Sequence, residues 1–321
     1  MKKITAAIGL ITILASAYVL YYKFGKVEKE NTKENIKTEA SNIWHAPDTS
    51  LAAQDAGADL IRYGRKLITA TSYYLGPKGK VSAISNGMNC QNCHLDAGTK
   101  PFGNNYGSVA SLYPKFRARS GGLESIEKRV NDCIQRSLNG DPLDSLSKEM
   151  KAMVAYIKWV GKDVPKGKKA EGSGLFPIEF LNRAADPAQG KLLYTKQCRL
   201  CHQQNGQGLI MIDSSRYIYP PLWGENSFNT GAGLFRISNF AKYIRANMPQ
   251  GATYLKPVLT EEEAWDIAAY VVSLPRPTKK FVGDWPKLET KPFDHPFGPY
   301  TDSLTEAQHK YGPFNPTDTK K

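Results

Sequence analysis

The stretches Cys90-Gln91-Asn92-Cys93-His94 and Cys198-Arg199-Leu200-Cys201-His202 share one pattern, Cys-x-x-Cys-His, and this pattern decides the fold. Two thiols at this spacing can each bond to a vinyl group of one porphyrin, and the adjacent histidine then binds the iron. A Cys-x-x-Cys pair alone also occurs in zinc sites, disulfides and thiol redox sites, which form the alternative interpretation. We predict two covalently bound haem c groups, attached through Cys90, Cys93, Cys198 and Cys201, with His94 and His202 as proximal iron ligands.

The chain has 321 residues, five cysteines and a formal net charge of +13. It is long enough for two small domains, and the haem motifs use four of the five cysteines. Cys133 is left over, and an unpaired thiol in an exported protein needs an explanation. The positive charge indicates anionic partners, such as an acidic redox protein, an anionic lipid surface or a small anionic substrate. Haem c is attached outside the cytoplasm, which excludes nucleic acid as a partner and predicts a periplasmic protein.

The N-terminal segment is typical of export. Lys2 and Lys3 precede an uncharged run up to Leu20, and Ala15-Ser16-Ala17 offers a small-x-small cleavage site. The run is almost long enough to span a bilayer. Residues 1–24 are therefore predicted to be a cleaved signal peptide or an anchor in the inner membrane. Residues 25–43 are rich in Lys, Glu, Asn and Thr and are predicted to form a polar tether.

The chain beyond the tether contains an internal repeat. Each haem motif follows a predicted helix that contains one glycine, Gly64 in the helix 58–68 and Gly190 in the helix that Asp186-Pro187 opens. Each unit also ends in a second helix, predicted over 150–160 and 265–274. A helix before the haem, a helix after it and loops between them are the pattern of cytochrome c domains. The predicted fold is mainly α, with two cytochrome c-type domains and little strand.

The two predicted domains are joined by a linker rich in Lys and Gly and are followed by a Pro-rich arm that carries seven aromatic residues. This aromatic content argues against disorder. We expect an irregular arm that packs over both domains and has no part in the chemistry. The predicted boundaries are 44–164 for the first domain with the active-site haem, 165–185 for the linker, 186–275 for the second domain with the electron-transfer haem, and 276–321 for the arm.

The sixth ligand of the first iron is predicted by elimination. Between His94 and the closing helix the sequence contains no methionine and no second histidine. Met88 is too near Cys90 to reach the opposite haem face, whereas methionines on the closing helix are expected to pack in the core. Cys133 remains as the strongest ligand, and its alternative is a buried, inert thiol. The weaker candidates are Lys100, Lys115 and Lys128.

In the second domain Met248, followed by Pro249, lies between the haem motif and the closing helix and is the predicted sixth ligand. Met211 is the competitor, while His295 and His309 in the arm are expected to have a surface or structural role. A thiolate lowers the potential of a haem and a methionine raises it. Electrons are therefore predicted to run from the haem of Cys133 to the haem of Met248.

Arginines surround Cys133 in the sequence. Residues 123–138 have helical spacing, which places Arg129, Cys133 and Ser137 on one face, with Arg136 one turn on and Arg119 just upstream. Guanidinium groups near a thiol lower its pKa and can bind an oxyanion through fixed donors. The alternative is a solvated helix face with scattered arginines. We predict a binding site for a small anion here.

At this point the sequence resembles a family, the dihaem thiosulfate dehydrogenases that form tetrathionate. The segments that carry the resemblance are 89–98, 113–121, 129–140 and 245–249, of which the Cys133 segment is the most specific. The resemblance implies that two thiosulfate ions give one tetrathionate and two electrons, and that Cys133 is both iron ligand and carrier of a covalent adduct. Arg119, Arg129, Arg136 and Ser137 would hold the anions. Some members have a lysine before the second-domain methionine, where this chain has Asn247.

The resemblance also implies an external electron acceptor, such as a small cytochrome or another redox protein. Two other functions stay open at this stage. The chain could be a dihaem electron-transfer cytochrome without its own catalysis, or a sulfur-transfer cytochrome of a thiosulfate-oxidising complex. A peroxidase is disfavoured, because it needs an open iron and both irons here have candidate sixth ligands.

Overall fold

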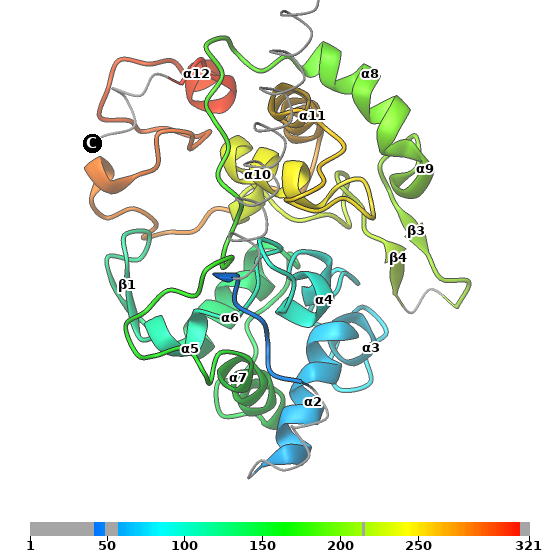
Figure 1. The fold of residues 1–321 in the computed structure, drawn as a ribbon, viewed down its shortest axis with the longest axis vertical. Coiled ribbons are helices and arrows are strands. Elements are labelled where there is room, and N and C mark those ends of the chain that lie inside the picture. Colours follow the sequence, from blue (N-terminus) through cyan, green and yellow to red (C-terminus); the bar gives the residue numbers. More distant parts are fainter. Residues whose placement is uncertain (1–41, 49–56, 214–215, 315–321) are drawn as a thin grey trace, which may run out of the picture. The chain divides into compact units, whose positions relative to one another are not determined.

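A computed structural model describes residues 42–48, 57–213 and 216–314, and one compact unit begins at Trp44 (Figure 1). The predicted signal or anchor, 1–24, and nearly all of the predicted tether, 25–43, lie outside the described residues. Among the helices within these ranges, none combines the length and the apolar character that crossing a membrane requires.

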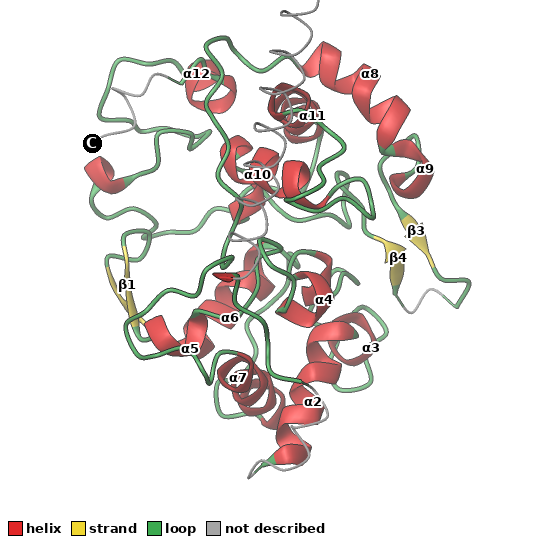
Figure 2. Cartoon of the chain, in the orientation of Figure 1, coloured by secondary structure: helices red, strands yellow, loops and turns green. Residues whose placement is uncertain are grey.

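Helices dominate both domains, and the strands form two short antiparallel hairpins (Figure 2). This confirms the mainly α fold with little strand. The first domain contains α2 (Ala58–Thr69), α3 (Thr71–Leu75), η2 (Cys90–Asn92), α4 (Leu95–Gly98), α5 (Val109–Leu112), β1 (Lys115–Arg117), β2 (Gly122–Glu124), α6 (Ile126–Arg136) and α7 (Lys148–Val160). The second contains α8 (Pro187–Gln197), α9 (Arg199–His202), β3 (Leu209–Ile210), β4 (Tyr217–Tyr219), η3 (Gly233–Phe235), α10 (Ile237–Asn247) and α11 (Glu261–Ser273). The arm contains η4 (Leu288–Thr290) and α12 (Glu306–Tyr311).

The internal repeat appears as two equivalent helix crossings, α2 on α7 and α8 on α11. At each crossing a glycine lets the helices touch backbone to backbone. A Cβ atom on Gly64 would lie 1.9 Å from the carbonyl oxygen of Ala152, and one on Gly190 would lie 1.9 Å from that of Asp266. No side chain fits at such distances. The match between the two glycines that the sequence indicated is therefore a match in packing.

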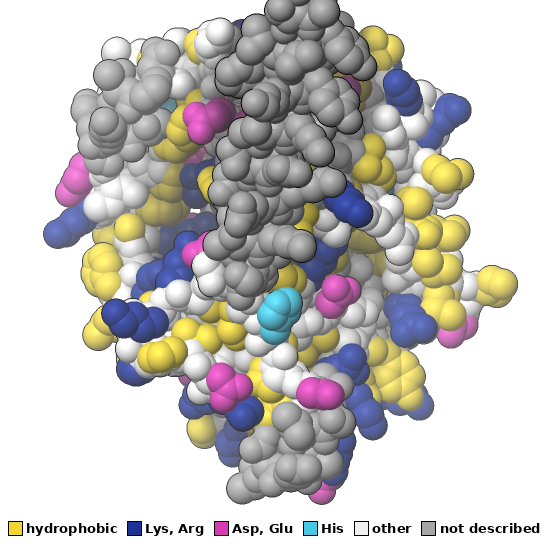
Figure 3. All heavy atoms as spheres, viewed as in Figure 1, with side chains coloured by type: hydrophobic (Ala, Val, Ile, Leu, Met, Phe, Trp, Pro, Cys, Tyr) yellow, Lys and Arg dark blue, Asp and Glu magenta, His cyan; other side chains and the backbone are white. Residues whose placement is uncertain are grey.

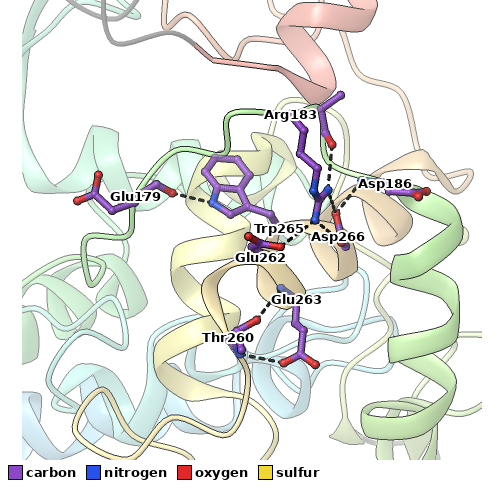
Figure 4. Close-up of polar contacts among 9 residues, drawn as sticks. Glu179, Arg183, Asp186, Thr260, Glu262, Glu263, Trp265 and Asp266 are labelled. Carbon is purple, nitrogen blue, oxygen red and sulfur yellow. Dashed lines mark hydrogen bonds and ion pairs between the residues drawn. The ribbon is translucent and has the colours of Figure 1, made fainter.

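Local signals in the sequence set the helix ends of the second domain (Figure 4). The Asp186 side chain accepts a hydrogen bond of 2.7 Å from the Ala188 amide and so caps α8. Thr260 and Glu263 form the capping box that starts α11. The buried Asp266 of α11 accepts hydrogen bonds from the Asp186 amide at 2.7 Å and from Arg183 at 2.9 Å. The end of the linker is thereby fixed to the closing helix.

The linker is packed rather than free. Ala170 and Ile178 are buried, and the Gly172 carbonyl accepts hydrogen bonds from the Phe102 amide and the Asn105 side chain at 2.7 and 2.8 Å. Phe176 lies edge-on to Phe102, with ring centroids 5.0 Å apart. The segment thus packs against both domains, since Gly172 bonds to the first domain and Ile178 belongs to the core of the second. Its Lys- and Gly-rich composition did not indicate this packing.

The arm packs against the second domain through buried groups. Phe314 is buried and contacts Trp265, with ring centroids 5.7 Å apart. The carboxylate of Asp294 is fully buried, and it accepts hydrogen bonds from the Arg236 side chain at 2.7 Å and the Ser238 amide at 3.2 Å. Both donors lie at the start of α10, so the arm supplies the cap of the helix that ends at Met248.

Candidate active site: two unequal cavities

The first cavity has a volume of about 500 Å³ and is lined by Cys90, Cys93, His94 and Cys133. The Nδ1 atom of His94 donates a hydrogen bond of 2.5 Å to the Asn104 carbonyl. Because this bond holds the Nδ1 proton, Nε2 is the nitrogen left for a metal. The ring stacks on Tyr106, with centroids 4.7 Å apart. The side chains of the first haem motif therefore gather around one space.

The second cavity, of about 400 Å³, repeats this arrangement with Cys198, Cys201 and His202 on its wall. The Nδ1 atom of His202 donates to the Pro220 carbonyl at 2.9 Å. Burial lowers the pKa of His202, which keeps its ring neutral and its Nε2 lone pair available. None of the five cysteines forms a disulfide bond. Two thiols and one oriented imidazole on each wall fit one covalently bound haem c per cavity.

Cys133 lies on α6 and faces His94 across the first cavity. Burial alone would raise the pKa of its thiol, but the positive charge of Arg129 and a hydrogen bond with the His94 ring outweigh it and lower the pKa to about 7. Burial raises the pKa of Cys90, by contrast, to about 11. Cys133 is thus held towards the thiolate, the form that binds metals and attacks electrophiles.

Two of the other predicted site residues, Arg129 and Ser137, also line the first cavity. The structure adds three further cations to this wall, namely Lys115 and Arg117 of β1 and Lys169 of the linker, of which Lys115 was considered above only as a weaker iron ligand. Among the described residues that line this cavity there is no Asp or Glu. The basic stretch before Cys133 was the sequence signal for Lys115 and Arg117. No sequence signal indicated Lys169, because the position of the linker depends on the fold.

Arg136 and Arg119 lie outside the described lining of the cavity, so the predicted ring of guanidinium groups around Cys133 is only partly formed. Arg136 makes two hydrogen bonds to Asp284 of the arm, at 2.8 and 2.7 Å, and stacks on Phe281 at 3.6 Å. Its donors are therefore directed to a carboxylate of the protein. We expected the arm to have no part in the chemistry, yet it neutralises one of the predicted site residues.

Arg119 lies against Trp285 of the arm, with its guanidinium carbon 5.6 Å from the ring centroid. Burial, together with the positive charges of Arg136 and Arg129, lowers the pKa of Arg119 to about 10. These three arginines are thus close enough to influence one another, although only Arg129 reaches the cavity wall.

The second cavity holds a different potential iron ligand, Met248, which directly follows α10. Met88 also lines this cavity, although it precedes the first haem motif. Met211 lies beside β3, where its sulfur contacts Arg216 at 3.0 Å. His309 is buried in the arm and bonds to the Phe293 carbonyl and to Asp302, which gives it a structural role.

The lysines considered as weaker ligands of the first iron are separated by the fold. Lys115 remains on the wall of the first cavity. Lys100 lines the second cavity and donates to the Ala252 carbonyl at 3.4 Å, whereas Lys128 pairs with Asp132 at 2.6 Å.

The two cavities adjoin, since Cys93 lines both. Hydrogen bonds fix the domains at this boundary. The Tyr243 hydroxyl donates to the Asn92 carbonyl at 2.9 Å, and Asn247 donates to the Phe102 carbonyl at 3.1 Å. Asn229 donates to the Gln135 carbonyl at 2.8 Å and so satisfies the end of α6, the helix of Cys133.

Comparison with known protein families finds one matching domain in each half of the chain. The family model described as SoxA/TsdA, cytochrome c domain, matches residues 80–165, and the model described as cytochrome C oxidase, cbb3-type, subunit III, matches residues 185–271. These matches confirm two cytochrome c domains and, with them, two haem c groups.

Several curated thiosulfate dehydrogenases are similar over most of the chain. The protein from Psychrobacter arcticus is 36% identical over 75% of this chain and 71% of its own length, and that from Allochromatium vinosum is 36% identical over 72% and 83%. A solved structure of thiosulfate dehydrogenase (TsdBA) from Marichromatium purpuratum aligns with a TM-score of 0.68 at 28% identity. The alignment covers 79% of this chain and 52% of that one, so this chain spans about half of its length. By these similarities the chain belongs to the thiosulfate dehydrogenase family.

Proposed function

We propose that this protein oxidises two thiosulfate ions to one tetrathionate in the first cavity, in a reaction that can run in both directions. The relatives named above support thiosulfate as the substrate. The observation that carries the proposal is the pairing of Cys133 with Arg129 in a cavity whose described lining has four cations and no carboxylate. A haem bound there supplies a one-electron acceptor, and a second haem in the second cavity supplies another.

Cys133 would serve as ligand of the first iron and as the sulfur that carries the adduct. In the first step, the Cys133 thiolate and the outer sulfur of thiosulfate form a sulfur–sulfur bond and release two electrons. The product, Cys133–S–S–SO₃⁻, carries one negative charge. In the second step, another thiosulfate attacks the outer sulfur of the new bond, tetrathionate leaves, and Cys133 returns as a thiolate. No proton is exchanged in either step.

The main barrier to this reaction is repulsion between anions. In each step a group with one negative charge meets a thiosulfate dianion, and at about 4 Å the two repel by ~2 kcal/mol even at the screening of bulk water, from two unit-charge pairs of ~1 kcal/mol each. Arg129 can offset this repulsion with forked donors, and Ser137 can donate a hydrogen bond to a sulfonate oxygen. Lys115 and Arg117 add charge on the same wall. Arg119 would attract the anion from outside the cavity wall. Arg136 would act indirectly, because its contact with Asp284 would hold the arm beside Arg119.

Electrons would pass from the haem ligated by His94 and Cys133 to the haem ligated by His202 and Met248, and then to an external redox protein. The contact of both cavities at Cys93 supports a short path between the haems. The proposed sixth ligands support electron transfer from the first haem to the second, because a thiolate favours ferric iron and a methionine favours ferrous iron. Covalent attachment of haem takes place after export, so we propose that the protein works in the periplasm.

The variant Cys133→Gly tests the proposal. We expect it to lose tetrathionate formation completely and to keep both haems, which pyridine haemochrome analysis would count. Ser111→Ala, which removes a buried hydroxyl bonded to Lys168 away from this cavity's lining, serves as the control with normal turnover. Normal turnover of Cys133→Gly would refute the assignment. A protein whose haems are not reduced by thiosulfate at all would instead be a plain electron carrier.

A further inference from the structure

We propose that four exposed aliphatic side chains next to the second haem motif form the docking surface for an acidic redox protein that takes the electrons. This haem-edge patch consists of Leu200, Leu209, Ile210 and Ile218, which are 88%, 41%, 42% and 52% exposed. In Figure 3, hydrophobic side chains gather over α9, β3 and β4. The inference rests on the proposed function, since it names the class of partner that removes the electrons.

The patch borders the second cavity. Leu200 stands between Cys198 and Cys201, the two thiols that attach the haem. Ile218 of β4 lines the cavity and is nevertheless half exposed, so it lies at the cavity's mouth. The hairpin is fixed beside the proximal ligand, because the Gly208 amide donates to the His202 carbonyl at 3.0 Å. A protein bound to the patch would therefore lie against the edge of the cofactor.

The first haem motif, unlike the second, is covered by the other domain. Its residue equivalent to Leu200 is Asn92, which is partly buried and whose carbonyl accepts the Tyr243 hydroxyl of the second domain at 2.9 Å. Its neighbour Gln91 is also partly buried and donates to the Thr69 carbonyl at 2.8 Å. Both residues line the second cavity, so the second domain covers the first motif. The second motif instead presents leucine to solvent, as an interaction site does.

The charge around the patch indicates an acidic partner. Between Asp186 and Asp213 the chain has three cations and no carboxylate. The three cations, Lys191, Lys196 and Arg199, are all exposed. Asp213, in the loop between β3 and β4, is the carboxylate next in the sequence, so cations are in excess along this segment. Apolar contacts beside an excess of positive charge suit a brief electron-transfer encounter, in which charge steers the approach and a small apolar contact allows rapid release.

Stopped-flow oxidation of the full-length dihaem protein tests this proposal. The protein is reduced with dithionite, which makes the measurement independent of thiosulfate chemistry. It is then mixed with a monohaem cytochrome c of acidic isoelectric point or with a basic one of similar potential. We expect the acidic acceptor to react about a hundredfold faster at about 10 mM salt, and its advantage to shrink at about 150 mM, where the Debye length is about 8 Å.

Two double variants separate charge from apolar contact. Lys196→Glu with Arg199→Glu should slow the acidic acceptor about tenfold at low salt only, and Leu209→Ser with Ile210→Ser should slow it about tenfold at both salt concentrations. The matched control is Lys151→Glu with Lys158→Glu, two exposed lysines of α7, with a change of about twofold or less. Haem content and thiosulfate-driven haem reduction should be unchanged in all three.

Equal rates with acidic and basic acceptors, or patch variants that behave like the α7 control, would overturn the docking surface. So would loss of binding to phosphatidylglycerol vesicles with no change in the rate of the acidic acceptor, because the patch would then be a membrane contact. Failure of thiosulfate to reduce the haems would contradict the proposed function alone, since the dithionite experiment would still report on docking.

Discussion

The two haem cavities share a frame of two crossing helices and differ in the side chains that face the haem. In each domain a glycine brings the helices together, two thiols and a histidine line the cavity, and a backbone carbonyl orients the histidine. The first cavity then receives Cys133 from α6, and the second receives Met248 from the end of α10. One scaffold thus offers an anionic sulfur ligand in one domain and a neutral one in the other.

The two cavities also differ in the charged residues that line them. The described lining of the first cavity has four cations and no carboxylate, whereas that of the second has one of each, Lys100 and Asp96. Tyrosine, proline and aliphatic side chains make up much of the second wall. An excess of positive charge suits binding of anions, and a balanced apolar wall suits retention of a haem that only relays electrons. Under the proposed function, this difference in charge would let one repeat support both catalysis and electron transfer.

The largest expected effect tests whether the two frames are equivalent. Gly64→Ala and Gly190→Ala each place a methyl group 1.9 Å from a backbone oxygen, so the helices must separate. We expect each substitution to lower the free energy of unfolding by about 3 kcal/mol, measured by urea unfolding of the dihaem protein. Gly122→Ala, where nothing lies within 4 Å, should be neutral. If only one of the two crossings were sensitive, the domains would not be packed alike.

The next effect tests the difference in charge. Arg129→Gln should lower kcat/KM for thiosulfate about a hundredfold, because a charge-assisted hydrogen bond of about 1.5–3 kcal/mol is lost and each 1.36 kcal/mol is tenfold in rate. Lys100→Gln removes the matching cation from the second cavity and should change kcat/KM by about twofold or less. Steady-state assays of both variants check this, and similar losses in both would remove the distinction between the cavities.

The smallest effect concerns His295 of the arm, which lies near several cations. Burial and the charges of Lys291, Arg236 and Arg119 lower the pKa of His295 to about 4. An unfolded histidine has a pKa near 6.5, so between pH 6.5 and 4 the unfolded chain binds a proton that the folded chain does not. The free energy of unfolding should therefore fall by about 2 kcal/mol as the pH decreases through this range.

His295→Phe should remove most of this pH dependence, and His45→Gln, a change at an exposed histidine, should leave it intact. Urea unfolding at pH 7, 5.5 and 4 measures both variants. An unchanged pH profile in His295→Phe would mean that burial and the nearby cations do not hold His295 neutral in the folded protein.

Features encoded within a few residues could be read from the sequence. Asp186-Pro187 starts α8 where predicted, since a cap acts within one turn. The capping box of Thr260 and Glu263 is an equally local signal, and it starts α11 at Glu261, four residues before the predicted helix 265–274. The two glycines could be matched because each is followed three positions later by a leucine, Leu67 or Leu193, in the helix before its haem motif. Arg129, Cys133 and Ser137 share a cavity because the 3.6-residue period already placed them on one helix face.

Contacts over long sequence distances could not be read in this way. Arg136 is one turn from the predicted face, but Asp284, 148 residues later, takes its donors. Lys169 reaches the first cavity from the linker, and Lys100 belongs to the second cavity although it follows the first haem motif. Each of these positions depends on how the linker, the arm and the two domains pack together, which no local pattern contains.

The central claim is that the first haem has Cys133 as its sixth ligand and the second has Met248. Electron paramagnetic resonance with near-infrared magnetic circular dichroism of the ferric protein tests it most directly. We predict one low-spin His/thiolate haem and one low-spin His/Met haem, of which Cys133→Gly loses only the first and Met248→Ala only the second. A first haem with nitrogen or thioether coordination, or a thiolate signal that survives in Cys133→Gly, would contradict the account.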